Sequence, residues 1–132
     1  MKKKIICFAI NSNEKANIII REAKKSNIFP IIFIKYYITK GLGAEWILGL
    51  KKTLSKSFSK NSFKLYVDVK NDYGLCFELI KMKVDFIKLN SNSLIFKKIN
   101  QIAKKNKVLI NPTFNILDLS KIKNISRRIS KL

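Results

Sequence analysis

The sequence predicts an α/β fold in which parallel strands alternate with helices over one domain, residues 1–132. The segment Phe63–Asn90, FKLYVDVKNDYGLCFELIKMKVDFIKLN, has the pattern of a strand, a short loop, an amphipathic helix and a second strand. Similar β-α-β units can be read on both sides of it. With 132 residues, 47% apolar side chains and two prolines, the chain suits a single packed core and not a disordered protein.

The N-terminal half of the chain predicts two strands and two helices. Their expected ranges are strand 4–10, helix 14–25, strand 31–36 and helix 44–58. Both strands are continuously apolar, as buried parallel strands are, and both helices carry apolar residues three and four positions apart. Asn11 and Glu14 fit a capping box before the first helix. A turn over 27–30 precedes the second strand, and a glycine-bearing loop over 39–43 precedes the second helix.

The C-terminal half continues the alternation. Its expected ranges are strand 63–69, helix 73–82, strand 84–89, helix 93–105 and strand 108–110. Leu65, Val67 and Val69 share one face of the first of these strands, and Pro112 stops the last one. Apolar residues at helical spacing near the end of the chain predict a last amphipathic helix that packs back on the core. They are Ile122, Ile125, Ile129 and Leu132.

About five parallel strands fit two architectures, a flavodoxin-like open sheet and half of a (βα)8 barrel. In both, the loops after the strands gather at one edge of the sheet, where ligands bind. The residues that this edge offers to a ligand are Asn11, Ser12, Lys40, Gly41, Gly43, Asp72, Asn90 and Asn111. A half-barrel also leaves open strand edges, so we expect either the C-terminal helix over an edge or a homodimer.

The net charge of +20 suggests nucleic acid as a partner, but its composition argues against a specific one. Lys supplies 25 of the 28 basic residues, whereas the guanidinium group of Arg is the one preferred for bidentate hydrogen bonds to phosphates and base edges. Lys, Ile and Asn make up 60 of 132 residues, a bias typical of an AT-rich genome. We expect weak, nonspecific attraction to polyanions and no specific nucleic acid. One continuous face formed by Lys97, Lys98, Lys104, Lys105 and Arg127 would indicate the opposite.

The start of the chain, MKKKIICFAI, imitates a signal peptide, but its apolar part is short and no small-residue cleavage site follows. We therefore expect a strand there, no membrane partner and a cytoplasmic protein. Cys7 and Cys76 have no CxxC spacing and the chain has no histidine, so both cysteines are expected to be buried small hydrophobes.

Two segments together resemble a family of small uncharacterised alphaproteobacterial α/β proteins. They are GLGAEWILGL and, after a gap, KLYVDVKNDYGLCFELIKMKVDFIKL, within residues 40–89. Trp46, Asp68, Asp72 and Gly74 fall at family positions. The family pattern has a strand that ends in Asp-Cys-Gly-Asp and, after a helix, an Arg-Ala-Gly turn. Here Val69 and Lys70 stand in place of the Cys and Gly, and Met82 and Lys83 stand in place of the Ala-Gly. The resemblance implies a barrel-fragment-like fold and brings no established activity.

Four features are candidates for chemistry. Lys40 and the glycines before the second helix suit an anion at free backbone N–H groups, or a tight turn that needs glycine. Asp68 lies near the end of an apolar strand, where it could orient a hydroxyl, hold a metal with Asp72 or act as a base. The simpler interpretation is an ion pair with a lysine such as Lys88, or a loop-capping role. Lys88 could form a Schiff base if it is desolvated. Asp72 is most simply a helix N-cap, and with two carboxylates and no histidine we expect no metal and no cofactor.

These features support two classes of function. The leading hypothesis is an α/β domain that binds a small anionic, phosphorylated ligand or a partner at the C-terminal edge of the strands. The alternative is a lyase, aldolase or isomerase of phosphosugar type, with Asp68 and Lys88 as catalytic residues. Nonspecific nucleic-acid binding through the basic surface is a second alternative. The sequence leaves open whether the protein is an enzyme.

Overall fold

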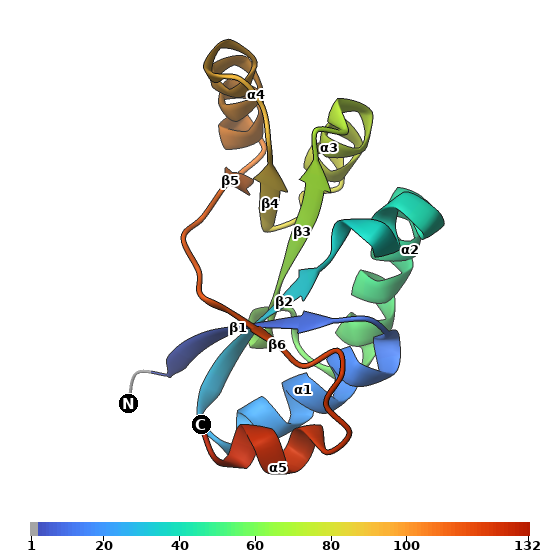
Figure 1. The fold of residues 1–132 in the computed structure, drawn as a ribbon, viewed down its shortest axis with the longest axis vertical. Coiled ribbons are helices and arrows are strands. Elements are labelled where there is room, and N and C mark those ends of the chain that lie inside the picture. The colour runs from blue at the N-terminus through green and yellow to red at the C-terminus, as the bar shows by residue number, and fades with distance from the viewer. Residues whose placement is uncertain (1–2) are drawn as a thin grey trace.

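Six parallel strands and five α-helices make up the part of the chain that the computed structural model describes, residues 3–132 (Figure 1). In chain order they are β1 Lys4–Ile10, α1 Asn13–Lys25, β2 Ile28–Ile34, α2 Tyr36–Ser57, a 3-10 turn Lys60–Ser62, β3 Lys64–Lys70, α3 Tyr73–Lys81, β4 Phe86–Leu89, α4 Ser93–Lys105, β5 Leu109–Ile110, β6 Ile116–Asp118 and α5 Ile125–Ser130. The predicted α/β fold is confirmed, with one strand more than expected.

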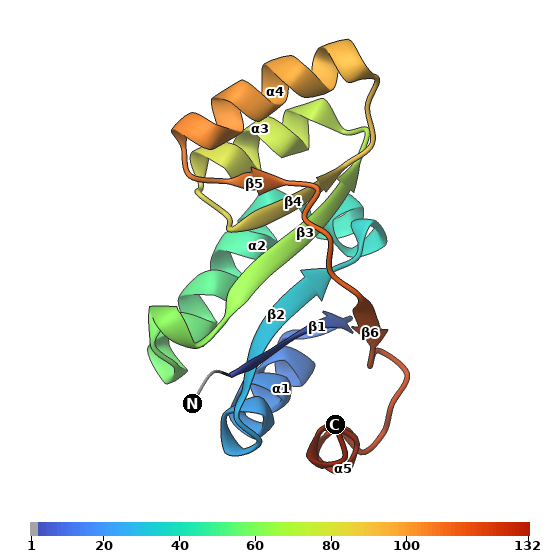
Figure 2. The ribbon, with the colours of Figure 1, turned by 90° about the vertical axis from the view of Figure 1, so that its left-hand side faces the viewer.

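The strands form one sheet in the order β5-β4-β3-β2-β1-β6. Consecutive strands from β1 to β5 are therefore neighbours, as in a half-barrel, whereas a flavodoxin-like sheet has the order 2-1-3-4-5. Because crossovers between parallel strands are right-handed, this sequential order leaves the connecting helices on one face. In the view of Figure 2, α1 and α2 lie behind the strands and α3 and α4 lie above β4 and β5, with the opposite face of the sheet toward the viewer.

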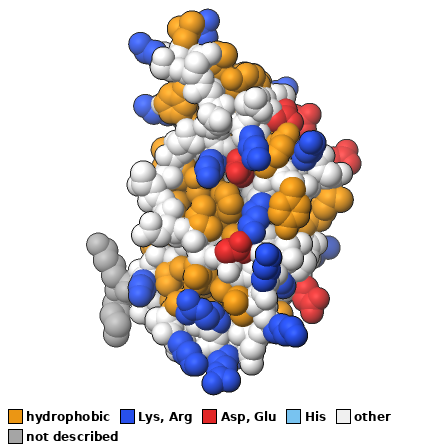
Figure 3. All heavy atoms as spheres, in the orientation of Figure 1, with side chains coloured by type: hydrophobic (Ala, Val, Ile, Leu, Met, Phe, Trp, Pro, Cys, Tyr) orange, Lys and Arg blue, Asp and Glu red, His pale blue; other side chains and the backbone are white. Residues whose placement is uncertain are grey.

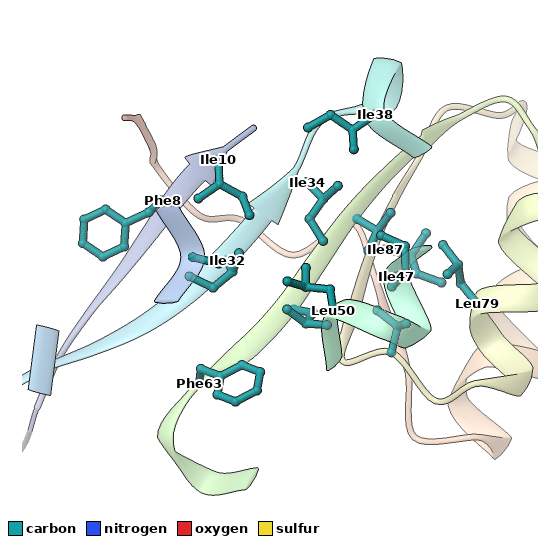
Figure 4. Packing of buried hydrophobic residues seen from close by; sticks show 14 of the residues in the cluster. Phe8, Ile10, Ile32, Ile34, Ile38, Ile47, Leu50, Phe63, Leu79 and Ile87 are labelled. Atoms are coloured by element: carbon teal, nitrogen blue, oxygen red, sulfur yellow. The ribbon is translucent and has the colours of Figure 1, made fainter. Parts of the chain in front are cut away.

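The main core lies between the sheet and these helices (Figure 4). Ile10 and Ile34 come from the strands and Ile47 and Leu50 from α2, and all four are fully buried. Each such side chain contributes about 1.5–3 kcal/mol by leaving water. Because side chains alternate between the two faces of a strand, Ile34 faces the helices and Phe33 faces the other side of the sheet.

The opposite face carries a smaller aromatic cluster. Phe33 and Tyr66 stand on neighbouring strands with their ring centroids 4.9 Å apart. The segment from β5 to β6 crosses this face (Figure 2). It places the ring centroid of Phe114 6.1 Å from that of Tyr66 and 5.1 Å from that of Phe86. The crossing segment therefore covers what would be the inside of a complete barrel.

The structure corrects four expected boundaries. The second strand starts at Ile28 and includes Pro30, for which a turn was predicted. Pairing with β3 begins only at Ile31, so at Pro30 the strand has a neighbour on one side only. The strand therefore tolerates the N–H group that proline lacks. The N-cap of α1 is Ser12 and not Asn11. The expected glycine loop is largely helical, and only Gly43, at φ 78°, breaks the helix.

The fourth correction concerns the C-terminal tail. Residues Ile116–Asp118 form β6, a strand that sequence reasoning missed, and it pairs with the outer edge of β1. The last helix, α5, is shorter than expected and packs against α1. The edge of β1 is thus covered by a strand, and the C-terminal helix packs against α1 and not over a strand edge.

Both cysteines are buried, as predicted, and they lie on different faces of the sheet. Cys7 belongs to the aromatic cluster and Cys76 to the helix-side core. Burial raises the pKa of Cys7 to about 12; burial, with a smaller contribution from Asp72, raises that of Cys76 to about 11. Among residues 3–132, no helix has the length and apolar character that crossing a membrane requires.

Candidate functional site

A pocket of about 600 Å³ opens at the C-terminal ends of β3 and β4. We call it the β3–β4 pocket, and its lining residues are Tyr66, Asp68, Lys70, Lys88, Leu89, Asn90, Asn111 and Pro112. Asp68 and Lys88 stand opposite each other in the register of the two strands. Four residues singled out from the sequence, Asp68, Lys88, Asn90 and Asn111, are thus brought together here.

A β-bulge shapes the rim of this pocket. The register between β3 and β4 shifts between Asp68 and Lys70, and Lys70 adopts a left-handed backbone with φ 49°. The Lys70 N–H donates to Asp68 Oδ1 at 2.9 Å, and the Asn90 N–H donates to the Lys70 carbonyl at 2.7 Å. Bulges re-aim side chains at strand ends, and here Lys70 Nζ lies 5.6 Å from the ring centroid of Tyr36.

The two asparagines of the pocket differ in whether their side-chain amides are already hydrogen-bonded. Asn111 Oδ1 accepts from the Leu89 N–H at 2.8 Å and its Nδ2 donates to the Leu89 carbonyl at 2.9 Å, so this amide imitates a neighbouring strand. The Asn90 side chain is exposed and makes no hydrogen bond within residues 3–132. Asn90 is therefore the side-chain amide that is free to bind a ligand, and Asn111 fixes the backbone of Leu89 in the pocket lining.

A second pocket, of about 420 Å³, lies beside the first at the end of β2. This β2–β3 pocket is lined by Lys35, Tyr36, Tyr37, Lys40, Asp68 and Lys70. The buried Thr39 hydroxyl lies 3.0 Å from the Tyr36 carbonyl and 3.4 Å from the Asp68 carbonyl, which fixes the start of α2 against β3. Lys40 is thereby placed near Asp68, while Gly41 and Gly43 line neither pocket.

The remaining predicted site residues have local structural partners. Ser12 Oγ accepts from the Lys15 N–H at 3.2 Å, and Asp72 Oδ1 accepts from the Leu75 N–H at 3.1 Å, so both cap helices. The Asn11 side chain donates to the Ser120 carbonyl at 3.3 Å. None of the three lines either pocket.

Sequence reasoning missed the most strongly held carboxylate, Asp118. Its Oδ2 lies 2.5 Å from Lys35 Nζ, and its Oδ1 accepts from the Ser120 hydroxyl at 2.6 Å and from the Ser120 N–H at 2.9 Å. These hydrogen bonds, led by the one from Lys35, lower the pKa of Asp118 to about 2. The signal in the sequence that could have indicated its strand, β6, is the short apolar run ILDL at residues 116–119.

Charge at the pockets is mainly positive and only partly paired. No ion pair joins Asp68 to Lys88 in the described part of the chain; Lys88 is exposed and its Nζ lies 5.9 Å from the ring centroid of Phe33. On the face seen in Figure 3, lysines are spread among hydrophobic side chains and do not form one stripe. α4 and α5 lie at opposite ends of the molecule (Figure 1), so Lys97 and Arg127 do not share a continuous face.

No family model matches this chain, and no curated protein matches it significantly.

Proposed function

We propose that this domain binds a small anionic, phosphorylated ligand in the β3–β4 pocket. The observation that carries the proposal is the convergence of Lys70 and Lys88 with the unpaired Asn90 amide around one pocket. Ammonium groups and amide N–H groups bind phosphate oxygens through charge-assisted and neutral hydrogen bonds. The pocket also lies at the carboxyl ends of parallel strands, where open α/β sheets bind ligands.

The backbone at the pocket supports the same proposal. Five non-glycine residues of the described chain have a positive φ. Three of them, Asn27, Lys83 and Lys107, lie just after helix ends, where a left-handed residue is ordinary. The other two, Lys70 and Asn111, both line the β3–β4 pocket. Asparagine adopts a left-handed backbone readily, whereas lysine does so rarely, so Lys70 is the strained residue; such strain concentrates at ligand sites.

Isothermal titration calorimetry with inorganic phosphate and fructose 6-phosphate, at about 0.15 M salt to screen surface charge, tests the proposal. Lys88→Met removes one ammonium group from the pocket and is expected to weaken binding about tenfold, the effect of losing one charge-assisted hydrogen bond. Lys105→Met, on the exposed face of α4, makes the same change in net charge and is expected to leave binding unchanged. Equal losses in both variants, or no binding by the unmodified protein, would contradict the proposal.

The register pairing of Asp68 with Lys88 keeps the phosphosugar-type lyase or aldolase as a second candidate. In that reaction Lys88 Nζ adds to a substrate carbonyl and expels water to give an imine, with Asp68 as the base. Lysines that form Schiff bases are desolvated in apolar pockets, whereas Lys88 is exposed. We therefore expect borohydride to trap no fructose 6-phosphate on Lys88, and a reduced adduct mapped to Lys88 by mass spectrometry would establish the enzymatic alternative.

A further inference from the structure

The two pockets at the C-terminal edge share a wall. Asp68 and Lys70 line both of them, with Lys88 and Asn90 on the β4 side and Lys40 on the α2 side. The wall is held from both sides, because the Lys70 carbonyl accepts from the Asn90 N–H and the Asp68 carbonyl lies within reach of the Thr39 hydroxyl. The two pockets are therefore fixed side by side.

Each pocket has a lysine of its own that is free to meet an anion. Lys88 has no carboxylate partner in the described chain, and neither has Lys40. Lys35 differs, because Asp118 lies 2.5 Å from its ammonium group and neutralises it. The positive charge available to a ligand is thus divided between Lys88 on one side and Lys40 on the other, with Lys70 between them.

Asp68 is the only carboxylate among the residues that line these two pockets. Its Oδ1 accepts from the Lys70 N–H, whereas its Oδ2 makes no hydrogen bond with any residue that the structure describes. A carboxylate oxygen with free lone pairs accepts hydrogen bonds and repels anions. The middle of the combined site therefore favours a hydrogen-bond donor on the ligand, whereas the two sides favour negatively charged groups.

From this arrangement, and building on the proposed anion binding, we infer that the ligand is a hydroxylated small molecule with an anionic group at each end. One anion meets Lys88 and Asn90, the other meets Lys40, and a hydroxyl between them donates to Asp68. A ligand that lacks the hydroxyl leaves Asp68 unpaired beside two anions, which lowers its affinity.

Calorimetry with three probes tests the inference: fructose 1,6-bisphosphate, fructose 6-phosphate, and hexane-1,6-diol bisphosphate, which has two phosphates and no free hydroxyl. The bisphosphorylated sugar is expected to bind about tenfold more tightly than the monophosphate, because it makes one more set of charge-assisted hydrogen bonds. Lys40→Met is expected to abolish that advantage and to weaken monophosphate binding much less than Lys88→Met does. Asp68→Asn keeps an acceptor for the Lys70 N–H and is expected to improve binding of the diol bisphosphate.

The outcomes separate this inference from the proposed function on which it rests. If both sugar phosphates bind equally, depend on Lys88 and ignore Lys40→Met, the single anion site stands and the bis-anionic ligand is refuted. If neither depends on Lys88, the proposed function and the inference fail together. Equal binding of both bisphosphates, with no effect of Asp68→Asn, would refute the role of the central hydroxyl.

Discussion

Replacing Asp118 with Asn removes one charge from the polar contacts that hold the C-terminal tail. The folded protein lowers the pKa of Asp118 from 3.8 to about 2. One pKa unit corresponds to about 1.4 kcal/mol, so the shift sets an upper limit of about 2.5 kcal/mol on the stability that the charge supplies. Half of the Asp118 side chain is exposed, and solvent screening reduces the expected loss to about 1 kcal/mol.

The pH dependence of this loss is specific. Because the pKa of Asp118 is lowered by folding, its charge stabilises the folded protein fully above pH about 4, and the stabilisation disappears as the pH falls toward about 2. Asp118→Asn is therefore expected to unfold at lower urea concentration than the unmodified protein at pH 7. The difference in free energy of unfolding is expected to narrow between pH 4 and pH 2.

Glu78→Gln is the matched control for this experiment. Glu78 is exposed on α3, its side chain has no salt bridge in the described chain, and the substitution makes the same change in net charge. It is expected to alter stability by less than about 0.5 kcal/mol. If Asp118→Asn also falls in that range at pH 7, or its effect does not change with pH, Asp118 does not secure the tail as described.

Three further predictions concern the core, the thiols and the surface charge. Leu50→Ala, at a fully buried position, is expected to cost about 2–5 kcal/mol in urea unfolding, and Leu94→Ala, at a position 66% exposed, less than about 0.5 kcal/mol; similar costs would contradict the assigned burial. Cys7 and Cys76 are expected to resist a disulfide reagent at pH 8 in the folded protein and to react in urea, since burial raises the pKa of both; fast reaction of the folded protein would show that they are accessible. Duplex DNA is expected to bind only at low salt, with a log-log slope near 0.9 per phosphate contact, and sequence-selective binding that survives about 0.2 M salt would overturn this.

The alternation of strands and helices could be predicted because each element carries its own periodicity. Residues 4–10 and 93–105 were predicted with the bounds that the structure has, since a continuous apolar run and a clear helical face leave little choice. The strand order could not be predicted, because a half-barrel and a flavodoxin-like sheet use the same elements. Pairing partners are tertiary facts that local patterns do not carry.

The missed strand and the misplaced loop have different physical causes. β6 is three residues long and is stabilised by pairing with β1 and by the contacts of Asp118 with Lys35, 83 positions earlier in the chain. The loop over 39–43 is mostly helical because Thr39 bonds to Tyr36 and packs against β3, which outweighs the weak helix propensity of Gly41. Long-range contacts decided both cases.

The candidate site was predictable in position and only partly in composition. The rule that ligands bind at the carboxyl ends of parallel strands singled out Asp68, Asn90 and Asn111. Lys88 was singled out separately, as a strand lysine that could pair with Asp68 or form a Schiff base. The rule could not separate the first three from Asn11, Ser12 and Asp72, which lie at the same edge, because a hydrogen bond to a neighbouring backbone group is visible only in three dimensions. The bulge that makes Lys70 part of both pockets has no signature in the sequence.

The most direct test of anion binding at this edge is a nuclear magnetic resonance titration of the ¹⁵N-labelled protein with inorganic phosphate at about 0.15 M salt. We expect saturable amide shifts that are largest at residues 68–71 and 88–91 and at Asn111 and Thr113. Shifts that follow the exposed lysines of α1 and α4 instead, and grow without saturating, would show that the positive surface attracts phosphate nonspecifically and that the β3–β4 pocket is not a binding site.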